Sequence, residues 1–290
     1  MGLLWLPAHA AVRQVDDRGK VVALVKPAAR IISLAPHITE LVFAVGAGDK
    51  LVGVSSYSDY PPAAKRIGVI GDGGKIDLER VVELRPDLVI AWQSGNHISD
   101  ITQLERLGIP VFVTEPRRLG DISKLLRTFG QLTGSVEQAE QSAAAFEKIR
   151  DALASRYSNA APVSVFYEIW HQPLMTVNSD HMISDVIRLC GGRNIFEAVH
   201  VLTPTVSMES VLAADPQVII ASGALYQDEA VWQDWQRFKQ LRAVKHHHLF
   251  SIHPDLIQRQ TPRILQGAEL MCRQLAQVRQ AASLITPRLP

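Results

Sequence analysis

The sequence predicts an α/β protein of two lobes joined by a long helix. Three observations support this fold class: short apolar runs alternate with stretches of helical spacing, one amphipathic stretch is much longer than the rest, and one helix–strand unit occurs twice. The chain has 290 residues, 47% of them hydrophobic, so it can bury one large core or two modest ones. We expect an N-terminal lobe over residues 12–134, a linking helix over 135–158 and a C-terminal lobe over 159–290.

The alternation begins early in the chain. Residues 31–34 form a short apolar run that stops at Pro36, and residues 39–45 then have helical spacing up to Gly46. Residues 87–92 form a continuous apolar run, as a strand buried on both faces requires. Strands that alternate with helices in this way predict largely parallel sheets.

The long stretch over residues 135–157 has a different pattern. Its apolar residues recur at steps of three and four, which is the spacing of one face of a helix. This pattern predicts a single amphipathic helix between the lobes. The apolar positions are Val136, Ala139, Ala143, Phe146, Ile149 and Leu153.

Residues 76–91 have a counterpart in residues 206–221. In each copy a glutamate, Glu79 or Glu209, stands seven residues before a proline that opens an apolar strand. The copies are about 130 residues apart, too far for a solenoid repeat. Duplication of a lobe and convergence on a common unit both explain the match. Two facing lobes would in either case form a cleft, where small ligands usually bind.

The charge of the chain excludes some partners. Thirty Lys and Arg stand against 29 Asp and Glu without a block of one sign, which argues against nucleic acid and against an anionic membrane surface as partner. No downstream run has the roughly 18 apolar residues of a membrane span.

The first residues indicate export. Residues 1–11 resemble the end of a secretory signal that closes on an A-x-A cleavage site, although the start of such a signal is missing. An ordinary flexible terminus is the alternative. We expect these residues to be the remnant of a signal peptide and the mature protein to be periplasmic.

Common catalytic signatures are absent from the sequence. Residues 46–48 lack the further glycine of a dinucleotide loop, and residues 71–75 lack the Ser or Thr that follows the lysine of a phosphate-binding loop. Neither G-x-S-x-G nor H-E-x-x-H occurs. An enzyme is therefore the weaker hypothesis.

His246, His247 and His248 are adjacent, and imidazole is a common metal ligand. Neighbouring residues of an extended chain point to opposite faces, which favours a solvated loop, so we expect no metal site. The only cysteines are Cys190 and Cys272. Exported proteins often pair two cysteines, and two buried thiols are the alternative.

The most informative segment is residues 52–62, a strand that breaks into a polar loop containing Tyr57 and ends at two prolines. Loops of this kind line the ligand crevice of an open α/β lobe. Trp92, at the end of the strand over 87–92, should emerge at the same rim. Flat aromatic side chains there suit a large, flat, partly apolar ligand. His37 begins a helix, where helix-capping and cleft-lining roles are both open.

Together with residues 78–80 and 87–92, the segment 53–62 resembles the vitamin B12-binding proteins of the Gram-negative periplasm. They belong to a helix-linked class of binding proteins for corrinoids, siderophores and haem. The likeness extends, with gaps, from Arg30 to Leu275, and it includes residues 189–196.

The resemblance implies two Rossmann-like lobes joined by a rigid helix. It also implies a monomer that captures a corrinoid, either cobalamin or cobinamide, in the cleft and delivers it to the permease and ATPase of an ABC transporter. No cofactor and no catalytic residue are expected. Haem or ferric-siderophore binding in the same fold is the alternative. A metal-cluster enzyme is less favoured, because two distant cysteines are too few for a cluster.

The resemblance also assigns roles to residues. Tyr57 and Trp92 would contact the corrin, and Asp255 and Arg259 would bind its amide periphery. Glu79 and Glu209 of the repeat would dock onto arginines of the permease. Cys190 and Cys272 would form a disulfide.

Two positions depart from the family. Gly73 and Thr203 stand where the family has tryptophans, which leaves the exact corrinoid open. Trp170, beside His171, becomes a further candidate for ligand contact, and His37 becomes a candidate to approach the cobalt.

Overall fold

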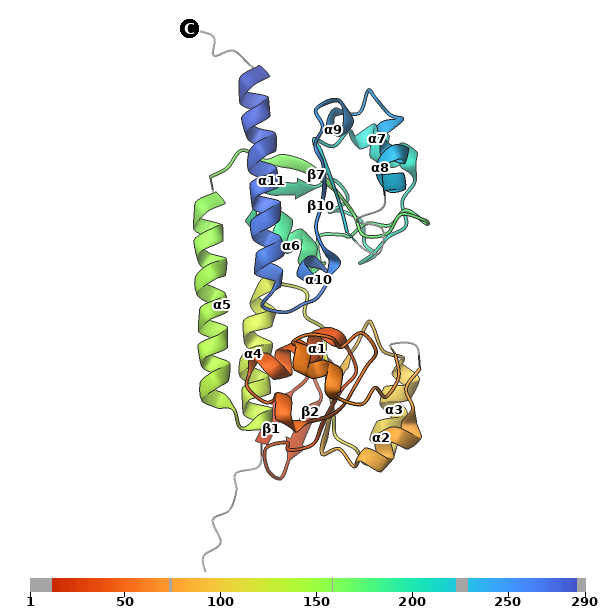
Figure 1. Cartoon of the computed structure of the whole chain (residues 1–290), viewed down its shortest axis with the longest axis vertical. Helices are drawn as coiled ribbons and strands as arrows, with labels where there is room; N and C mark the ends of the chain where they lie inside the picture. Colours follow the sequence, from red (N-terminus) through yellow and green to blue (C-terminus); the bar gives the residue numbers. More distant parts are fainter. Residues whose placement is uncertain (1–11, 73–74, 158, 223–228, 286–290) are drawn as a thin grey trace, which may run out of the picture. The chain divides into compact units, whose positions relative to one another are not determined.

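The computed structural model describes residues 12–72, 75–157, 159–222 and 229–285, so the expected signal remnant and Gly73 lie outside the described residues. Within these ranges the chain divides into two compact units (Figure 1). Unit 1 contains residues 12–115 and 122–145, and unit 2 contains residues 116–121 and the chain from residue 146 onward. The predicted α/β fold with two lobes is confirmed.

The sheet of unit 1 is fully parallel. Its strand order is β4-β3-β5-β6, and β5 is buried along its length except at its last residue, Trp92. This burial confirms the continuous apolar run as a strand covered on both faces. The strands are β3 (Ile31–Ser33), β4 (Leu51–Val54), β5 (Leu88–Trp92) and β6 (Val111–Thr114).

The sheet of unit 2 repeats this arrangement. Its order is β10-β9-β7-β8, again parallel throughout, so in both sheets the first strand along the chain is flanked by the second and the third. The strands are β7 (Val163–Glu168), β8 (Gly192–Asn194), β9 (Val218–Ala221) and β10 (Leu249–Ser251).

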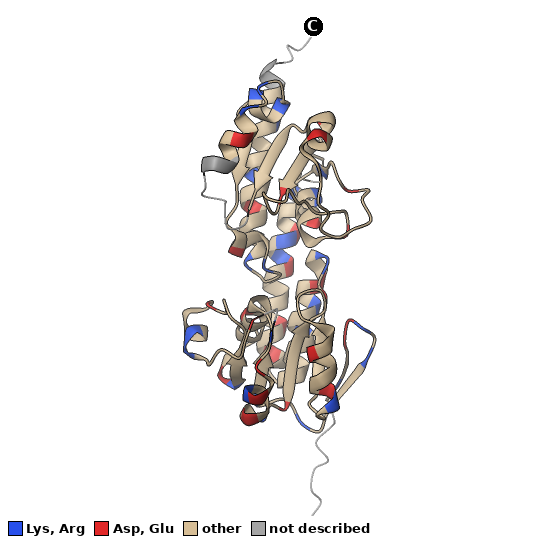
Figure 2. Cartoon of the chain, turned by 90° about the vertical axis from the view of Figure 1, so that its right-hand side faces the viewer, with Lys and Arg blue, Asp and Glu red and all other residues tan. Residues whose placement is uncertain are grey.

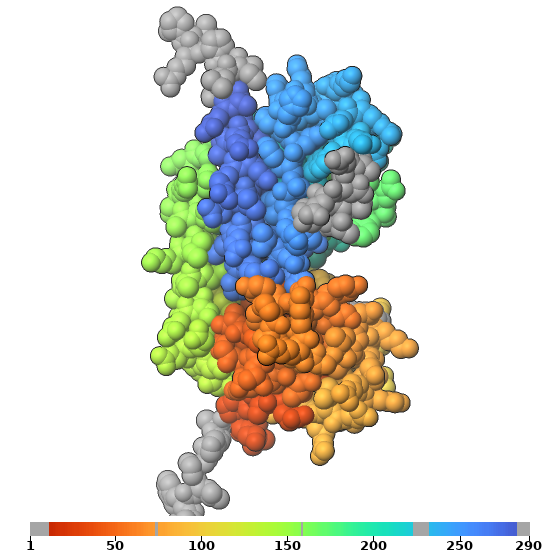
Figure 3. Space-filling view, viewed as in Figure 1, coloured from red at the N-terminus to blue at the C-terminus, as the bar shows by residue number. Residues whose placement is uncertain are grey.

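Helices follow the strands, because parallel neighbours need long crossover connections. In unit 1 they are α1 (Pro36–Ala44), α2 (Leu78–Leu84) and α3 (Ile98–Arg106). In unit 2 they are α6 (Met182–Leu189), α7 (Met208–Ala214), α8 (Glu229–Gln236), α9 (Arg242–Lys245), α10 (Pro254–Ile257) and α11 (Ile264–Ile285). Helix α11 lies at the surface of unit 2 in the space-filling view (Figure 3).

Two helices contain residues of both units, namely α4 (Leu119–Thr133) and α5 (Val136–Tyr157). Helix α5 corresponds to the amphipathic stretch of the sequence. Ala139 and Phe146 on its apolar face are buried, whereas Ile149 is 53% exposed. Ala139 also contacts α4 closely: a Cβ added at Gly130 would lie 2.3 Å from its methyl group.

The internal repeat is visible in the structure. Helices α2 and α7 have seven residues each, and their N-cap side chains, Asp77 and Ser207, accept a hydrogen bond from the backbone three residues on. Both helices end at a residue in the left-handed conformation, Arg85 (φ 45°) and Asp215 (φ 42°). The two copies thus have the same local structure and lead into equivalent strands, β5 and β9.

Three smaller features complete the fold. Strands β1 (Val12–Val15) and β2 (Val21–Leu24) form an antiparallel pair in unit 1. A disulfide joins Cys190 to Cys272 in unit 2, which confirms the expected pairing. Positively and negatively charged residues are interspersed along the chain in both units (Figure 2). In the described ranges, no helix is both long and apolar enough to cross a membrane.

Candidate functional site

The strand order of each unit indicates where a ligand can bind. In unit 1 the chain passes from β3 to β4 on one side and then crosses to β5 on the other, so the strand order reverses between β3 and β5. Unit 2 has the same reversal between β7 and β9. Ligands of open α/β sheets bind beyond the carboxyl ends of the strands at this point. The candidate site residues follow these strand ends.

In unit 1 the reversal point is occupied by His37 and Trp92. Trp92 ends β5, and His37 is the second residue of α1, which follows β3. Their ring centroids are 5.1 Å apart at an angle of 87°, an edge-to-face contact of the favourable kind. His37 is buried, with 3% exposed. The structure thus brings together two residues that the sequence suggested separately.

Two further residues fix this aromatic pair. Asn96 accepts a hydrogen bond from the backbone N–H of Trp92 at 2.7 Å and donates one to the carbonyl of Leu34 at 2.9 Å, so it bridges the chain after β3 and the end of β5. Gly95 lies against the indole, and a Cβ there would come within 1.9 Å of a ring carbon of Trp92. Sequence reasoning missed both residues, because nothing in their local pattern marks them.

Tyr57 projects from the loop after β4. Its side chain is 81% exposed, and its backbone adopts φ 65°, which is uncommon for a residue with a side chain. The flanking serines hold the loop: the Ser55 N–H donates to the Ser33 carbonyl at 3.0 Å, and Thr39 Oγ1 donates to Ser58 Oγ at 2.9 Å. An anchored loop therefore presents an exposed aromatic ring.

In unit 2 the residues after β10 form an ion pair. Arg259 lies 3.0 Å from the Asp255 carboxylate, and the two side chains are 14% and 31% exposed. Next to them, Gln258 donates to Ser222 Oγ at 2.8 Å, and Ser222 shares a short hydrogen bond with the Tyr167 hydroxyl. Burial raises the pKa of Tyr167, so this hydroxyl stays neutral. The Gln258 contact links the end of α10 to the ends of β7 and β9.

Trp170 lies in a turn after β7. Its side chain is 45% exposed, and residue 170 pairs with Met175, which pairs in turn with Thr205. Thr203 stands where the resemblance predicts a tryptophan that this chain lacks. It lies two residues before Thr205, which pairs with Met175 of this turn. The exposed Trp170 ring and the Thr203 position belong to neighbouring segments of unit 2.

A buried polar network that the sequence did not predict lies beneath this turn. The Glu168 carboxylate, 2% exposed, accepts a hydrogen bond from Trp235 Nε1 at 2.6 Å and contacts His171 Nδ1 at 2.7 Å. The other ring nitrogen of His171 lies 3.1 Å from Asp234. The one sign of this network in the sequence is that a largely apolar strand ends in a glutamate, Glu168.

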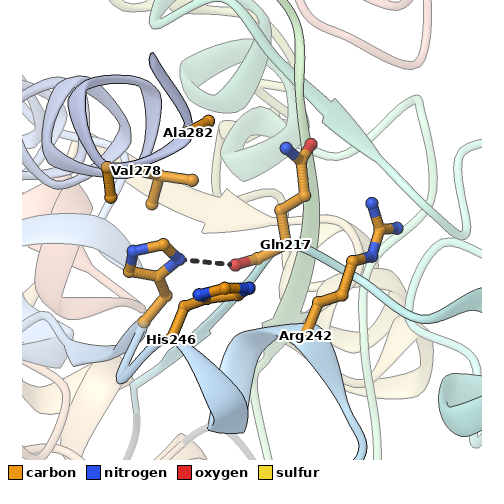
Figure 4. A pocket seen from close by; sticks show the side chains of 7 residues that line it. Gln217, Arg242, His246, Val278 and Ala282 are labelled. Carbon is orange, nitrogen blue, oxygen red and sulfur yellow. Dashed lines mark hydrogen bonds between the residues drawn. The ribbon is translucent and has the colours of Figure 1, made fainter. Parts of the chain in front are cut away.

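A cavity of about 210 Å³ lies elsewhere in unit 2 (Figure 4). It adjoins the residues before β9 and β10, at the amino ends of these strands, and is smaller than ordinary ligand pockets. The rings of His246 and His248 stack at 5.8 Å there, while His247 adopts φ 57°. The lining residues are Gln217, Arg242, His246, His248, Val278, Ala281 and Ala282.

The histidine tract occupies a turn between α9 and β10. Among the residues that the structure describes, no three His, Cys, Asp or Glu side chains are placed to hold a metal ion.

The comparisons with known proteins agree with this geometry. Residues 31–256, from β3 to the start of α10, match the model of the periplasmic binding protein family. The chain belongs to the periplasmic binding protein family. This match includes both sheets, and so both points at which the strand order reverses.

Curated relatives in this family cover almost the whole chain. The vitamin B12-binding protein of Yersinia pestis is 38% identical over 278 residues, which is 96% of each chain. The vitamin B12-binding protein of Vibrio cholerae is 37% identical over 246 residues, 85% of this chain and 88% of the relative.

Solved structures of the periplasmic binding protein family show the same fold. The vitamin B12 binding protein BtuF of Vibrio cholerae has a TM-score of 0.81 and 36% identity, and the match covers 87% of this chain and 98% of BtuF. The haem-binding protein RhuT of Roseiflexus has a TM-score of 0.75 and 25% identity over 86% of this chain and 98% of RhuT.

Proposed function

We propose that this chain is a non-enzymatic binding protein of the periplasm that captures a corrinoid and delivers it to an ABC importer. The observation that carries this proposal is the 38% identity to a vitamin B12-binding protein over 96% of both chains. Binding of a ligand without bond cleavage is also consistent with the absence of catalytic signatures from the sequence.

The geometry of the strand ends supports a corrin as ligand. Unit 1 offers the flat rings of Tyr57 and Trp92, which suit a planar, partly apolar macrocycle. Unit 2 offers Asp255 and Arg259, an acceptor and a donor group that suit the amide side chains of a corrinoid. We propose these four residues as ligand contacts.

Two further residues have more specific proposed roles. His37 is buried edge-on against Trp92, and this contact supports a role in orienting the indole. A cobalt bond from His37 would require this buried ring to move. Trp170 is exposed near the segment of Thr203, and this position supports a role as the aromatic contact that replaces a family tryptophan.

Calorimetric titration of the purified chain with cyanocobalamin, cobinamide and haem tests the proposed function. We expect saturable binding of the two corrinoids at one site for each chain, and haem binding at least tenfold weaker. Tighter binding of haem than of both corrinoids would contradict the proposal and would favour the haem alternative, in which the exposed Tyr57 side chain is a candidate iron ligand.

A further inference from the structure

The turn that carries Trp170 is closed by backbone hydrogen bonds at its base. The Ile169 N–H donates to the Met175 carbonyl at 3.1 Å, the Met175 N–H donates to Trp170 at 2.9 Å, and the indole N–H donates to the Gln172 carbonyl. Two hydrogen bonds close the turn, and the third lies within it. The Val206 N–H also donates to the Leu174 carbonyl at 2.9 Å, which ties the end of the turn to the chain before α7. His171 is the residue of the turn whose side chain ties it to the end of β7.

His171 joins the turn to two other elements. Its Nδ1 contacts Glu168 at the end of β7 at 2.7 Å, and its Nε2 contacts Asp234 in α8 at 3.1 Å. The His171 side chain is 10% exposed. Glu168 is fixed in turn by Trp235, whose fully buried indole donates to it at 2.6 Å. The imidazole is thus held between two carboxylates, one at the end of β7 and one in α8.

This geometry requires a proton. A neutral imidazole has one N–H group, but both ring nitrogens of His171 face carboxylate oxygens. Both contacts become hydrogen bonds when the Glu168–His171 pair holds one additional proton, which lies on the imidazole or is shared with the carboxylate. Loss of this proton leaves a ring nitrogen facing a carboxylate, lone pair against lone pair.

The charged surroundings favour the protonated state. Burial opposes a charge on the imidazole, but hydrogen bonds to Asp234 and Glu168 and their negative charges outweigh burial and raise the pKa of His171. Burial likewise raises the pKa of Glu168. Among the described residues, the other charged group in contact with this network is Arg237, which lies 3.2 Å from Asp234 and is 75% exposed.

We propose that His171 is a positioning residue for corrinoid binding: held between Glu168 and Asp234, it fixes the turn that carries Trp170, and it releases this turn when the pair loses its proton. This inference rests on the proposed function, because the position of Trp170 matters only if Trp170 contacts the ligand. It goes beyond that function by giving ligand capture a dependence on pH.

The direction of the pH effect follows from linkage. The pKa of His171 is higher in the folded chain than the reference value of about 6.5 for the unfolded chain. The stabilisation is therefore fully present below about pH 6.5 and is lost as pH rises through the folded pKa. Affinity for a ligand that needs the fixed turn must fall over the same range.

The test compares wild type with His171→Gln between pH 6.5 and 9. Glutamine retains hydrogen-bonding groups but cannot bind the proton. His248→Gln is the matched control, since His248 is a partly buried histidine of unit 2 that contacts the Gln217 carbonyl at the opposite end of the strands. Three quantities are measured: affinity for cyanocobalamin, stability of the free protein in urea, and hydrogen exchange of residues 169–175.

For wild type and His248→Gln we expect the cyanocobalamin dissociation constant to rise about threefold to tenfold over this range. Release of one proton changes a binding constant by at most about tenfold for each pH unit. Stability should fall, and the protection of residues 169–175 from exchange, relative to the base-catalysed intrinsic rate at each pH, should fall in parallel. His171→Gln should show the high-pH affinity and the low protection at every pH.

The possible outcomes separate this inference from the proposed function. If wild type binds no cyanocobalamin, the proposed function fails, and so does the binding role of His171, while stability and exchange still show whether His171 holds the turn. Equal pH profiles for wild type and His171→Gln would overturn the inference. So would a pH-dependent turn with pH-independent affinity, because His171 would then be structural only. If His171→Gln does not fold, the change with pH in the protection of residues 169–175 in wild type decides whether the turn is released, and unchanged protection would overturn the inference.

Discussion

At the scale of single residues, aromatic side chains at the strand ends could be predicted from the sequence, whereas their buried polar partners could not. Tyr57 and Trp92 follow apolar runs, and such runs end at the edge of a parallel sheet where ligands bind. Asn96 bridges two strand ends, and His171 lies between two carboxylates. These roles depend on contacts with residues far away in the sequence, which local patterns do not contain.

Trp92 provides the most direct test at this scale. Replacement by alanine should weaken cyanocobalamin binding by about 1–3 kcal/mol, the usual cost of removing a buried aromatic contact. It should also remove much of the quenching of tryptophan fluorescence that an absorbing macrocycle causes. Fluorescence titration measures both effects in one experiment.

A second variant separates the position of the indole from its presence. Gly95→Ala places a methyl group where the Trp92 ring lies, so it should weaken binding while all five tryptophans of the chain remain. Trp232→Ala, on α8, is the control for general loss of fluorescence. Unchanged affinity in both Trp92→Ala and Gly95→Ala would refute the assignment of Trp92 as a ligand contact.

At the scale of elements, hydrophobic periodicity predicted the longer helices and the buried strands best. The apolar run over 87–92 became β5, and the stretch over 135–157 became α5. The short pieces were harder to predict, because α9 and α10 have four residues each and contain too few positions for a period. Their boundaries are set by caps and by neighbouring elements instead.

The disulfide links two of these elements. Cys190 is the C-cap of α6, Cys272 lies within α11, and the two residues are 82 apart in sequence. Both sulfur atoms belong to fully buried residues of unit 2. Cys190 precedes β8 at its amino end, away from the strand ends that carry the candidate site.

We expect the double change Cys190→Ala and Cys272→Ala to lower the free energy of unfolding by about 2–4 kcal/mol. A cross-link that closes a long loop restricts the unfolded chain, and this restriction is lost in the variant. Urea unfolding of both proteins at one pH measures the difference. Affinity for cyanocobalamin should stay within twofold of wild type, and a large loss of affinity would show that the bridge also supports the binding edge.

At the scale of the whole molecule, the internal repeat gave the best evidence for two lobes. Both sheets have the same parallel strand order, and the matched helices α2 and α7 have the same caps. Contacts such as that of Arg118 with Ser179, which place residues 116–121 in unit 2, have no signature in the local sequence. The repeat therefore predicts that two similar units exist. It does not predict to which unit a short segment such as residues 116–121 belongs, because this depends on contacts with residues far away in the sequence.

The repeat also leads to the last prediction, which concerns Glu79 and Glu209. Each is the second residue of its helix, and each is exposed. A hydrogen bond from its own backbone N–H, with a further one from Ser207, lowers the pKa of Glu209, so this carboxylate is charged at neutral pH. Two exposed carboxylates at equivalent places suit a partner with two equivalent basic sites, and we propose that this partner is the permease of an ABC importer.

The double variant Glu79→Ala, Glu209→Ala should therefore bind cyanocobalamin as wild type does but support transport at least tenfold more slowly in vesicles that contain the importer. Loss of one close charge pair across an interface costs about 1.5 kcal/mol or more, which already corresponds to this factor. The control is Glu137→Ala, Glu269→Ala, which removes one exposed carboxylate from each unit outside α2 and α7 and changes the net charge equally. Slow transport in the control as well would attribute the effect to net charge, and normal transport by the Glu79, Glu209 variant would exclude docking through these helices.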